Sequence, residues 1–79
     1  MLKLINLKKN NGIISAEYDP ENSGEIGSVS VDVESEEVVE STLSKMDKTF
    51  PIYLNHAIDA LIKMKDEKDL PTEKLIMWC

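Results

Sequence analysis

The sequence predicts an α+β fold: an antiparallel β-meander of four strands, then one amphipathic helix on one face, then a C-terminal strand that joins the sheet (β-β-β-β-α-β). Three observations predict it. Apolar and polar residues alternate through the first half of the chain, turn-forming residues separate the alternating runs, and one run with helical spacing follows at 51–68. Seventy-nine residues suffice for one domain, so we expect 1–79 to form a single unit with a thin core.

The first two strands are predicted to flank a tight turn. Residues 1–7 form an apolar run with two polar interruptions, and the alternation at 14–18 is typical of a strand with one buried face. Asn11-Gly12 lies between them, and both residue types tolerate the positive φ angles of a two-residue hairpin. Residues 19–24 are turn formers and predict a loop.

The third strand has the clearest pattern. Residues 28–33 alternate valine with serine or aspartate, and the polar break at 34–37 has hairpin length. Residues 38–43 are rich in β-branched side chains and predict a fourth strand. A short helix over 37–45 remains an alternative.

The last two elements are a helix and a strand. Pro51 suits a first helical turn, and the apolar residues that follow it share one broad arc of the helix. Leu70-Pro71 ends the helix, and 74–79 predicts a strand. We expect that strand antiparallel beside the first, with both termini in the sheet centre, in preference to a parallel position beside the fourth. One helix cannot cover five strands, so we expect an apolar strip of sheet to stay open, as at many dimer contacts.

Charge and composition restrict the function. The net charge is −6, the segment 12–44 holds nine acids and no base, and the chain has no arginine, so nucleic-acid binding is not expected. One cysteine and one histidine provide neither a disulfide nor a zinc spacing, and we expect no metal and no cofactor. No apolar run is long enough for a signal peptide or membrane helix, which predicts a cytoplasmic protein without membrane contact.

His56 is the candidate acid–base residue. It is the only histidine, and Asp59 follows it at a spacing that allows an oriented pair, with Asp47 as another partner. The helix contains no serine or threonine nucleophile, and His56 lies on its polar face among charged residues. The sequence therefore indicates no complete catalytic site.

Two binding candidates remain. Trp78 is the only tryptophan, a residue type enriched in cores and at interfaces. Four acids gather at the third hairpin and could hold a basic partner: Glu34, Glu36, Glu37 and Glu40.

The leading functional hypothesis is a small non-catalytic protein-binding or regulatory domain that forms a homodimer. One alternative is a small enzyme that uses His56 at a dimer cleft. The other is an acidic inhibitor or nucleic-acid mimic that acts through Glu34–Glu40. We also expect deletion of 75–79 to unfold the domain, because this segment concentrates large apolar side chains.

Overall fold

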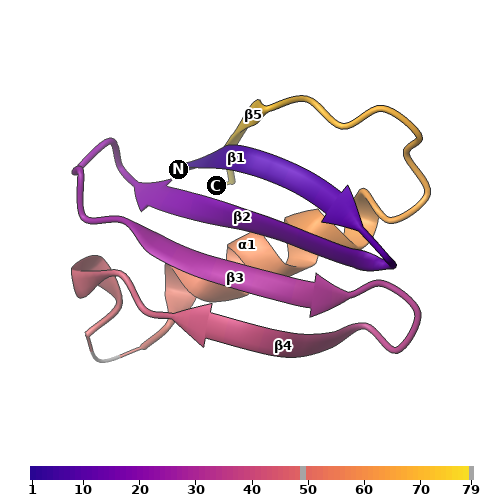
Figure 1. Ribbon diagram of the computed structural model, residues 1–79. Helices are drawn as coiled ribbons and strands as arrows, with labels where there is room; N and C mark the ends of the chain where they lie inside the picture. The colour runs from indigo at the N-terminus through magenta and orange to yellow at the C-terminus, as the bar shows by residue number, and fades with distance from the viewer. Residues whose placement is uncertain (49, 79) are drawn as a thin grey trace.

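A computed structural model describes residues 1–48 and 50–78. The elements are β1 (Leu2–Asn10), β2 (Ile13–Pro20), β3 (Gly27–Asp32), β4 (Glu37–Thr42), the 3₁₀ helix η1 (Lys45–Asp47), α1 (Ile52–Lys63) and β5 (Glu73–Ile76). The five strands form one sheet of order β4-β3-β2-β1-β5, antiparallel throughout (Figure 1). The predicted α+β fold is confirmed, including the position of the last strand beside the first. The expectation that both termini occupy the sheet centre is wrong, because β5 is itself an edge strand.

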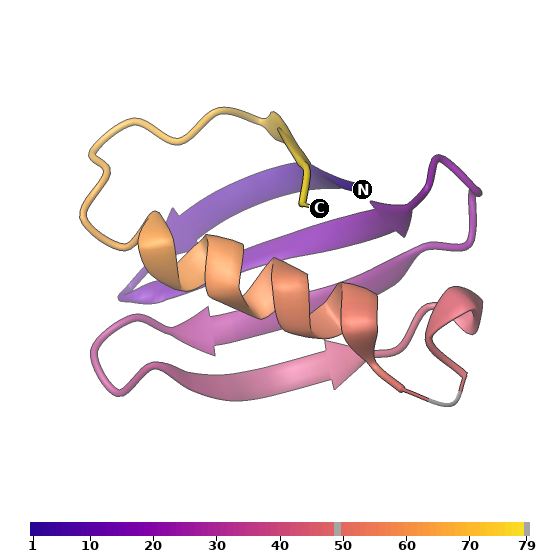
Figure 2. The same ribbon diagram turned by 180° about the vertical axis from the view of Figure 1, so that it is seen from behind.

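The core lies between α1 and one face of the sheet, as Figure 2 shows from the helix side. Alternate residues of the first three strands point to this face, and α1 adds its own apolar arc. The buried apolar side chains are Leu2, Leu4, Leu7, Ile14, Ala16, Tyr18, Val29, Val31, Leu54, Ala57, Ala60, Leu61 and Met64. The core is a single layer of side chains between the helix and the sheet, as expected for a small domain with two layers of secondary structure.

The β1–β2 turn has the predicted chemistry. Asn11 and Gly12 have φ angles of 52° and 78°, which is the left-handed geometry that joins twisted strands in two-residue hairpins. Gly27, at the start of β3, serves a different purpose. It lies opposite Tyr18 in the ladder, and a methyl group on its Cα would overlap the Tyr18 ring. The glycine therefore lets the tyrosine lie flat across the sheet.

The helix is shorter than predicted, since α1 ends at Lys63 rather than at Lys68. Met64 is the last buried apolar residue at this end of the helix, and the five residues that follow it are all charged. With no apolar side chain to hold them on the sheet, they form tight turns instead. Lys9 secures this end of the helix, because its Nζ donates to the Lys65 carbonyl at 2.6 Å.

Residues 37–42 form a strand, so the predicted fourth strand is confirmed over the helical alternative. The ladder between β3 and β4 carries a bulge, with Ser30 opposite Glu40 but Val31 opposite Val38. Val39 is therefore the extra residue. The segment after β4 contains the short 3₁₀ helix η1.

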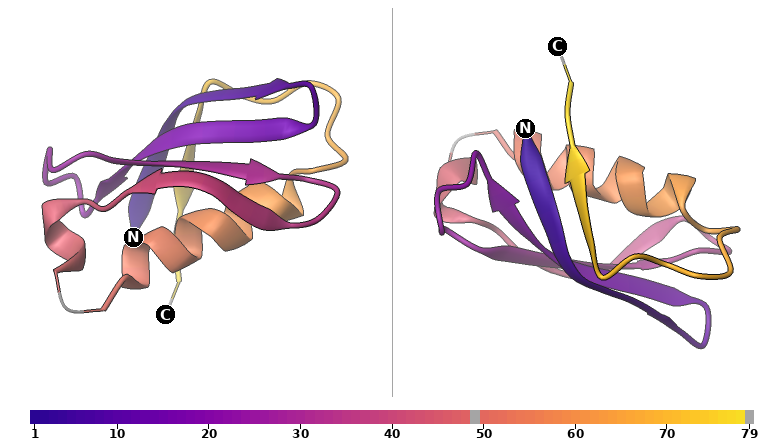
Figure 3. Two further views of the ribbon diagram at one scale, coloured as in Figure 1. Left: turned by 60° about the horizontal axis from the view of Figure 1, so that its bottom comes forward. Right: turned by 90° about the horizontal axis from the view of Figure 1, so that it is seen from above.

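The distribution of apolar side chains over the sheet differs from the prediction. The outer face, which no helix covers, is polar: its cross-strand neighbours include Ser15 with Ser30, and Glu17 with Ser28. The predicted apolar strip is therefore absent from this face, because the same alternation that directs valines inward directs serines outward. Exposed apolar side chains occur instead at the β4 edge, which comes forward in the left panel of Figure 3.

Candidate functional site

The acidic residues of the third hairpin form a charged edge along β4. Glu34 and Glu36 lie in the β3–β4 turn, whose backbone is organised by Asp32: its Oδ1 accepts from the Glu34 and Ser35 amides at 2.9 and 3.3 Å. Glu36 adopts a left-handed φ of 60° and pairs with Lys65 at 2.9 Å. This ion pair joins the hairpin to the end of the helix and raises the pKa of Lys65.

The other two acids of this group lie on β4 itself. Glu37 is opposite Asp32, and Glu40 is opposite Ser30, so neither has a basic cross-strand neighbour. Within the described residues no ion pair involves Glu37 or Glu40. Two like charges directly opposite one another destabilise a strand pair. The structure therefore places uncompensated negative charge at this edge of the sheet.

Large apolar side chains are exposed along the same segment. All six residues of β4 are exposed, including Val38 and Val39. Of the ten large apolar residues that are exposed in the described chain, six lie between residues 38 and 52: Val38, Val39, Leu43, Met46, Phe50 and Ile52. We call residues 37–43 the β4 surface. The sequence predicted the strand here but not the exposure of its valines, because β-branched residues occur both in strands that are covered and in strands that are open.

His56 and Asp59 line a groove between α1 and the C-terminal segment. The groove has a volume of about 490 Å³, and Lys63 and Lys74 contribute charged rims. Asp59 binds Lys63 at 2.9 Å rather than orienting the imidazole. Asp47, the other predicted partner of the histidine, is buried and bonded elsewhere. The structure thus brings His56 and Asp59 to one groove without forming an acid–base pair.

Trp78 is the aromatic partner of His56. The two rings stack at 3.8 Å with an interplanar angle of 11°, and Tyr53 meets the other part of the indole edge-on at 5.7 Å. Ile76 and Trp78 point inward, whereas Leu75 and Met77 are exposed. The indole is half-buried and packed against the core. This stack makes Trp78 part of the packing that holds the C-terminal segment on the helix.

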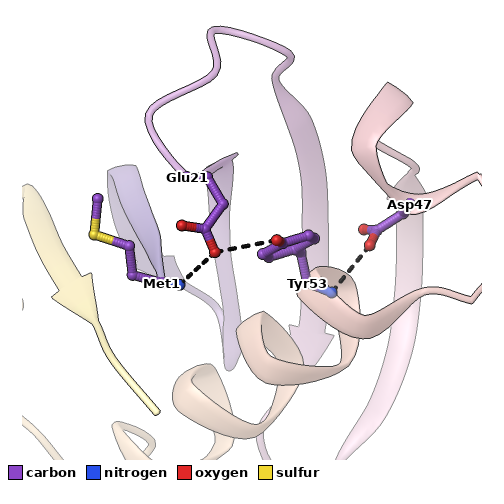
Figure 4. A network of polar contacts seen from close by, with 4 residues as sticks. All are labelled: Met1, Glu21, Asp47 and Tyr53. Atoms are coloured by element: carbon purple, nitrogen blue, oxygen red, sulfur yellow. Dashed lines mark hydrogen bonds and ion pairs between the residues drawn. The ribbon is translucent and has the colours of Figure 1, made fainter. Parts of the chain in front are cut away.

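The buried network around Asp47 was not predicted. Asp47 Oδ2 accepts from the Tyr18 hydroxyl at 2.8 Å and from the Leu54 amide at 3.0 Å, and Oδ1 accepts from the Tyr53 amide at 3.0 Å (Figure 4). The carboxylate therefore caps α1 from outside the helix, where Pro51 provides no side-chain cap. Burial, more than the nearby carboxylate, raises the pKa of Tyr18 to about 12. The signal available in the sequence was an acid just upstream of a helix start.

A second polar network joins the chain start to the helix. Glu21 Oε2 accepts from the Met1 ammonium at 2.7 Å and from the Tyr53 hydroxyl at 3.1 Å (Figure 4). These bonds lower the pKa of Glu21, and partial desolvation together with the glutamate raises the pKa of Tyr53. Every member of the network is engaged with another, so this network positions the β2–β3 loop and the helix rather than a reacting group.

The outer face of the sheet forms a shallow hollow that is lined by both polar and apolar residues. Its lining includes Ser15, Ser28, Ser30 and Thr72, and Asn6 donates to Glu17 at 2.5 Å across its edge. The hollow has hydroxyl groups but no histidine or cysteine. Such a lining supplies hydrogen bonds without an activated nucleophile.

Other classes of site find no support in the part of the chain that the structure describes. Residues 1–48 and 50–78 contain no group of three metal-ligating side chains. Among the same residues, no helix has both the length and the apolar character needed to cross a bilayer. The chain matches no protein-family model, no curated protein and no solved structure.

Proposed function

We propose that this chain is a non-catalytic protein-binding domain and that the β4 surface is its binding site. One observation carries the proposal: Val38, Val39 and Leu43 are exposed on or directly after β4, an open edge strand of the sheet, while the outer face is polar and the opposite face is packed. Apolar exposure beside a polar surround is a common property of protein interfaces.

The edge position supports binding through the backbone as well. β4 pairs with β3 on one side only, so alternate residues of β4 direct their N–H and C=O groups away from the sheet. Proteins usually blunt such an edge with lysine, proline or a covering segment. β4 has neither residue type, and its protective features are the bulge at Val39 and the charges of Glu37 and Glu40, which still admit a strand of opposite charge. An edge left open in this way favours a partner strand.

The proposal also covers the kind of partner and the cellular compartment of the chain. A second copy of the chain remains one predicted partner, and the homodimer remains a prediction. A chain with a single cysteine needs no oxidising compartment, which supports a cytoplasmic location. Sedimentation velocity at micromolar concentration measures the dimer directly.

A site-specific photo-crosslinker tests the surface. We expect a crosslinker at Val39 to capture a discrete protein in the cells that make this chain, and one at Asn22, an exposed loop position distant in the sequence, to capture none. A His56→Ala variant carrying the Val39 crosslinker should give the same product, since the groove takes no part. Equal capture from Val39 and Asn22 contradicts the proposal, as does loss of capture with His56→Ala.

A further inference from the structure

We infer that β4 binds an extended segment of a partner protein that alternates basic and apolar residues, added to the sheet as a sixth strand next to β4. This inference rests on the proposed function, since it names the partner class for the same surface. The three properties of the partner follow from three separate features of β4: its open backbone, its charge and the difference between its two faces.

The open backbone requires an extended partner. All of β4 is exposed, and no other element of the described chain covers its free edge. Beyond the bulge, Glu40–Thr42 is in regular register with β3, and Leu43 follows with half of its surface exposed. A strand added here gains main-chain hydrogen bonds that a helix or a loop cannot make.

The charge requires a basic partner. Glu37 and Glu40 lie on β4 without basic neighbours, and Glu34 adds a third acid at the turn. Among residues 1–48 and 50–78, the one lysine bonded to this hairpin is Lys65, and it is used by Glu36. Lysine or arginine opposite Glu37 and Glu40 would remove the repulsion with Asp32 and form cross-strand pairs.

The two faces require alternation. Glu37, Glu40 and Thr42 share the outer, polar face, whereas Val38 lies on the inner face opposite Val31. The flank of α1 nearest to the hairpin carries Ile58, Ile62 and then Lys65, the residue that binds Glu36. Successive side chains of a strand point to opposite faces, so the partner's basic residues belong outside and its apolar residues inside, beside the two half-buried isoleucines.

The same features disfavour a second copy of the chain at this edge. Antiparallel pairing of two β4 strands would place two sets of unpaired glutamates together, and the segment 12–44 contains no base to neutralise them. The bulge at Val39 would also interrupt both strands of the seam. We therefore assign the edge to a partner of opposite charge.

Titration of the full chain with synthetic peptides tests the inference. The probes are a ten-residue peptide alternating lysine and valine, its glutamate–valine counterpart, and a peptide of the same composition with the lysines grouped at one end. We expect amide chemical shifts to move along β4 and at Ile58 and Ile62 with the alternating basic peptide only. Amide hydrogen exchange in β4 should slow in the same complex.

Charge reversal provides the matched control. Glu37→Lys with Glu40→Lys should weaken binding of the basic peptide by about tenfold or more, because two attractive pairs become repulsive. Glu73→Lys makes the same kind of charge change on β5, the opposite edge, and should change affinity by less than about twofold. Equal loss in both variants would mean unspecific attraction and overturn the inference.

The remaining outcomes separate this inference from the proposed function. If the grouped or acidic peptide binds β4 as well as the alternating one, or if the chain dimerises through β4, the partner class is wrong while the β4 surface remains a binding site. If all shifts fall in the α1–β5 groove or on the outer face, both the inference and the proposed function are wrong.

Discussion

In this thin core, individual buried polar residues contribute strongly to stability. Asp47 is the clearest case, since one carboxylate at 2% exposure bonds Tyr18 and the first turn of α1. No ion pair within residues 1–48 and 50–78 involves Asp47, so hydrogen bonds and the helix dipole stabilise its carboxylate. The helix that forms one layer of the core therefore depends on a residue outside it.

Asp47→Asn is expected to destabilise the fold by about 1–3 kcal/mol. The amide has one oxygen, so one of the three donors now bonded to the carboxylate must face an NH₂ group instead. Urea denaturation monitored by circular dichroism measures the loss. Asp59→Asn is the control, because its exposed pair with Lys63 should change stability by less than about 1 kcal/mol. Similar losses in both variants would contradict the role given to Asp47.

Alkaline pH should reveal the same network. In the folded chain the pKa of Tyr18 is raised from 10.0 to about 12, so the native state keeps a proton that the unfolded chain releases. The stabilisation is complete below pH 10 and is lost as pH rises from 10 towards 12. We expect the free energy of unfolding to fall with pH in this window more steeply for the native chain than for Tyr18→Phe. Parallel pH profiles for the two proteins would contradict this reading.

At the scale of elements, the periodicity of the sequence predicted the strands whose pattern follows from having one buried face. It did not predict the features that depend on which elements contact one another in the fold. The valine–serine alternation at 28–33 and the Asn11-Gly12 turn were sufficient to locate β3 and the first hairpin. The end of α1 was placed too late, because helical spacing continues formally beyond Met64 where the sheet no longer provides an apolar surface. The candidate site was predicted in part: the acids of β4 were visible in the sequence, but the exposure of Val38 and Val39 depends on which strand lies at the edge.

The C-terminal segment is expected to stabilise the fold substantially, although less than its composition suggested. Leu75 and Met77 are exposed, which leaves Ile76 and Trp78 as the packed side chains. Deletion of 75–79 removes these two half-buried groups and part of the β1–β5 ladder, a loss of about 3 kcal/mol. That loss should lower the melting temperature by about 10–20 °C. The prediction of complete unfolding rested on the burial of the large apolar side chains Leu75, Ile76, Met77 and Trp78, of which the structure buries only Ile76 and Trp78, each in part.

Two point variants test the C-terminal contribution without truncation. Trp78→Ala should lower the melting temperature because it removes the stack on His56 and the contact with Tyr53. Met77→Ala, one residue away and 71% exposed, should leave the melting temperature within about 2 °C. If both variants have a melting temperature close to that of the native chain, the C-terminal segment does not stabilise the packing of α1. Its apolar residues are then free for a partner.

For the whole molecule, the charge is divided between parts of the fold. Strands β2, β3 and β4 are adjacent in the sheet and come from the segment without a base, whereas β1 and α1 bring lysines. The described ion pairs are three, Met1–Glu21, Asp59–Lys63 and Lys65–Glu36, and all are solvent-exposed. Exposed pairs contribute little, about 0–1 kcal/mol each. We therefore expect the repulsion among the acids of three neighbouring strands to be the larger electrostatic effect.

Salt should consequently stabilise this protein. Raising the ionic strength from about 0.01 M to about 0.5 M shortens the Debye length from about 30 Å to a few ångströms, which screens repulsion across the sheet before it affects contacts of 3 Å. We expect the urea midpoint to rise with sodium chloride, and Glu40→Gln to reproduce part of the rise at low salt because it removes one unpaired charge from β4. Glu36→Gln is the matched comparison in the same hairpin and should give no such gain, since its charge is already compensated by Lys65. A midpoint that falls with salt would show that the ion pairs outweigh the repulsion, and would also remove the charge argument for a basic partner at β4.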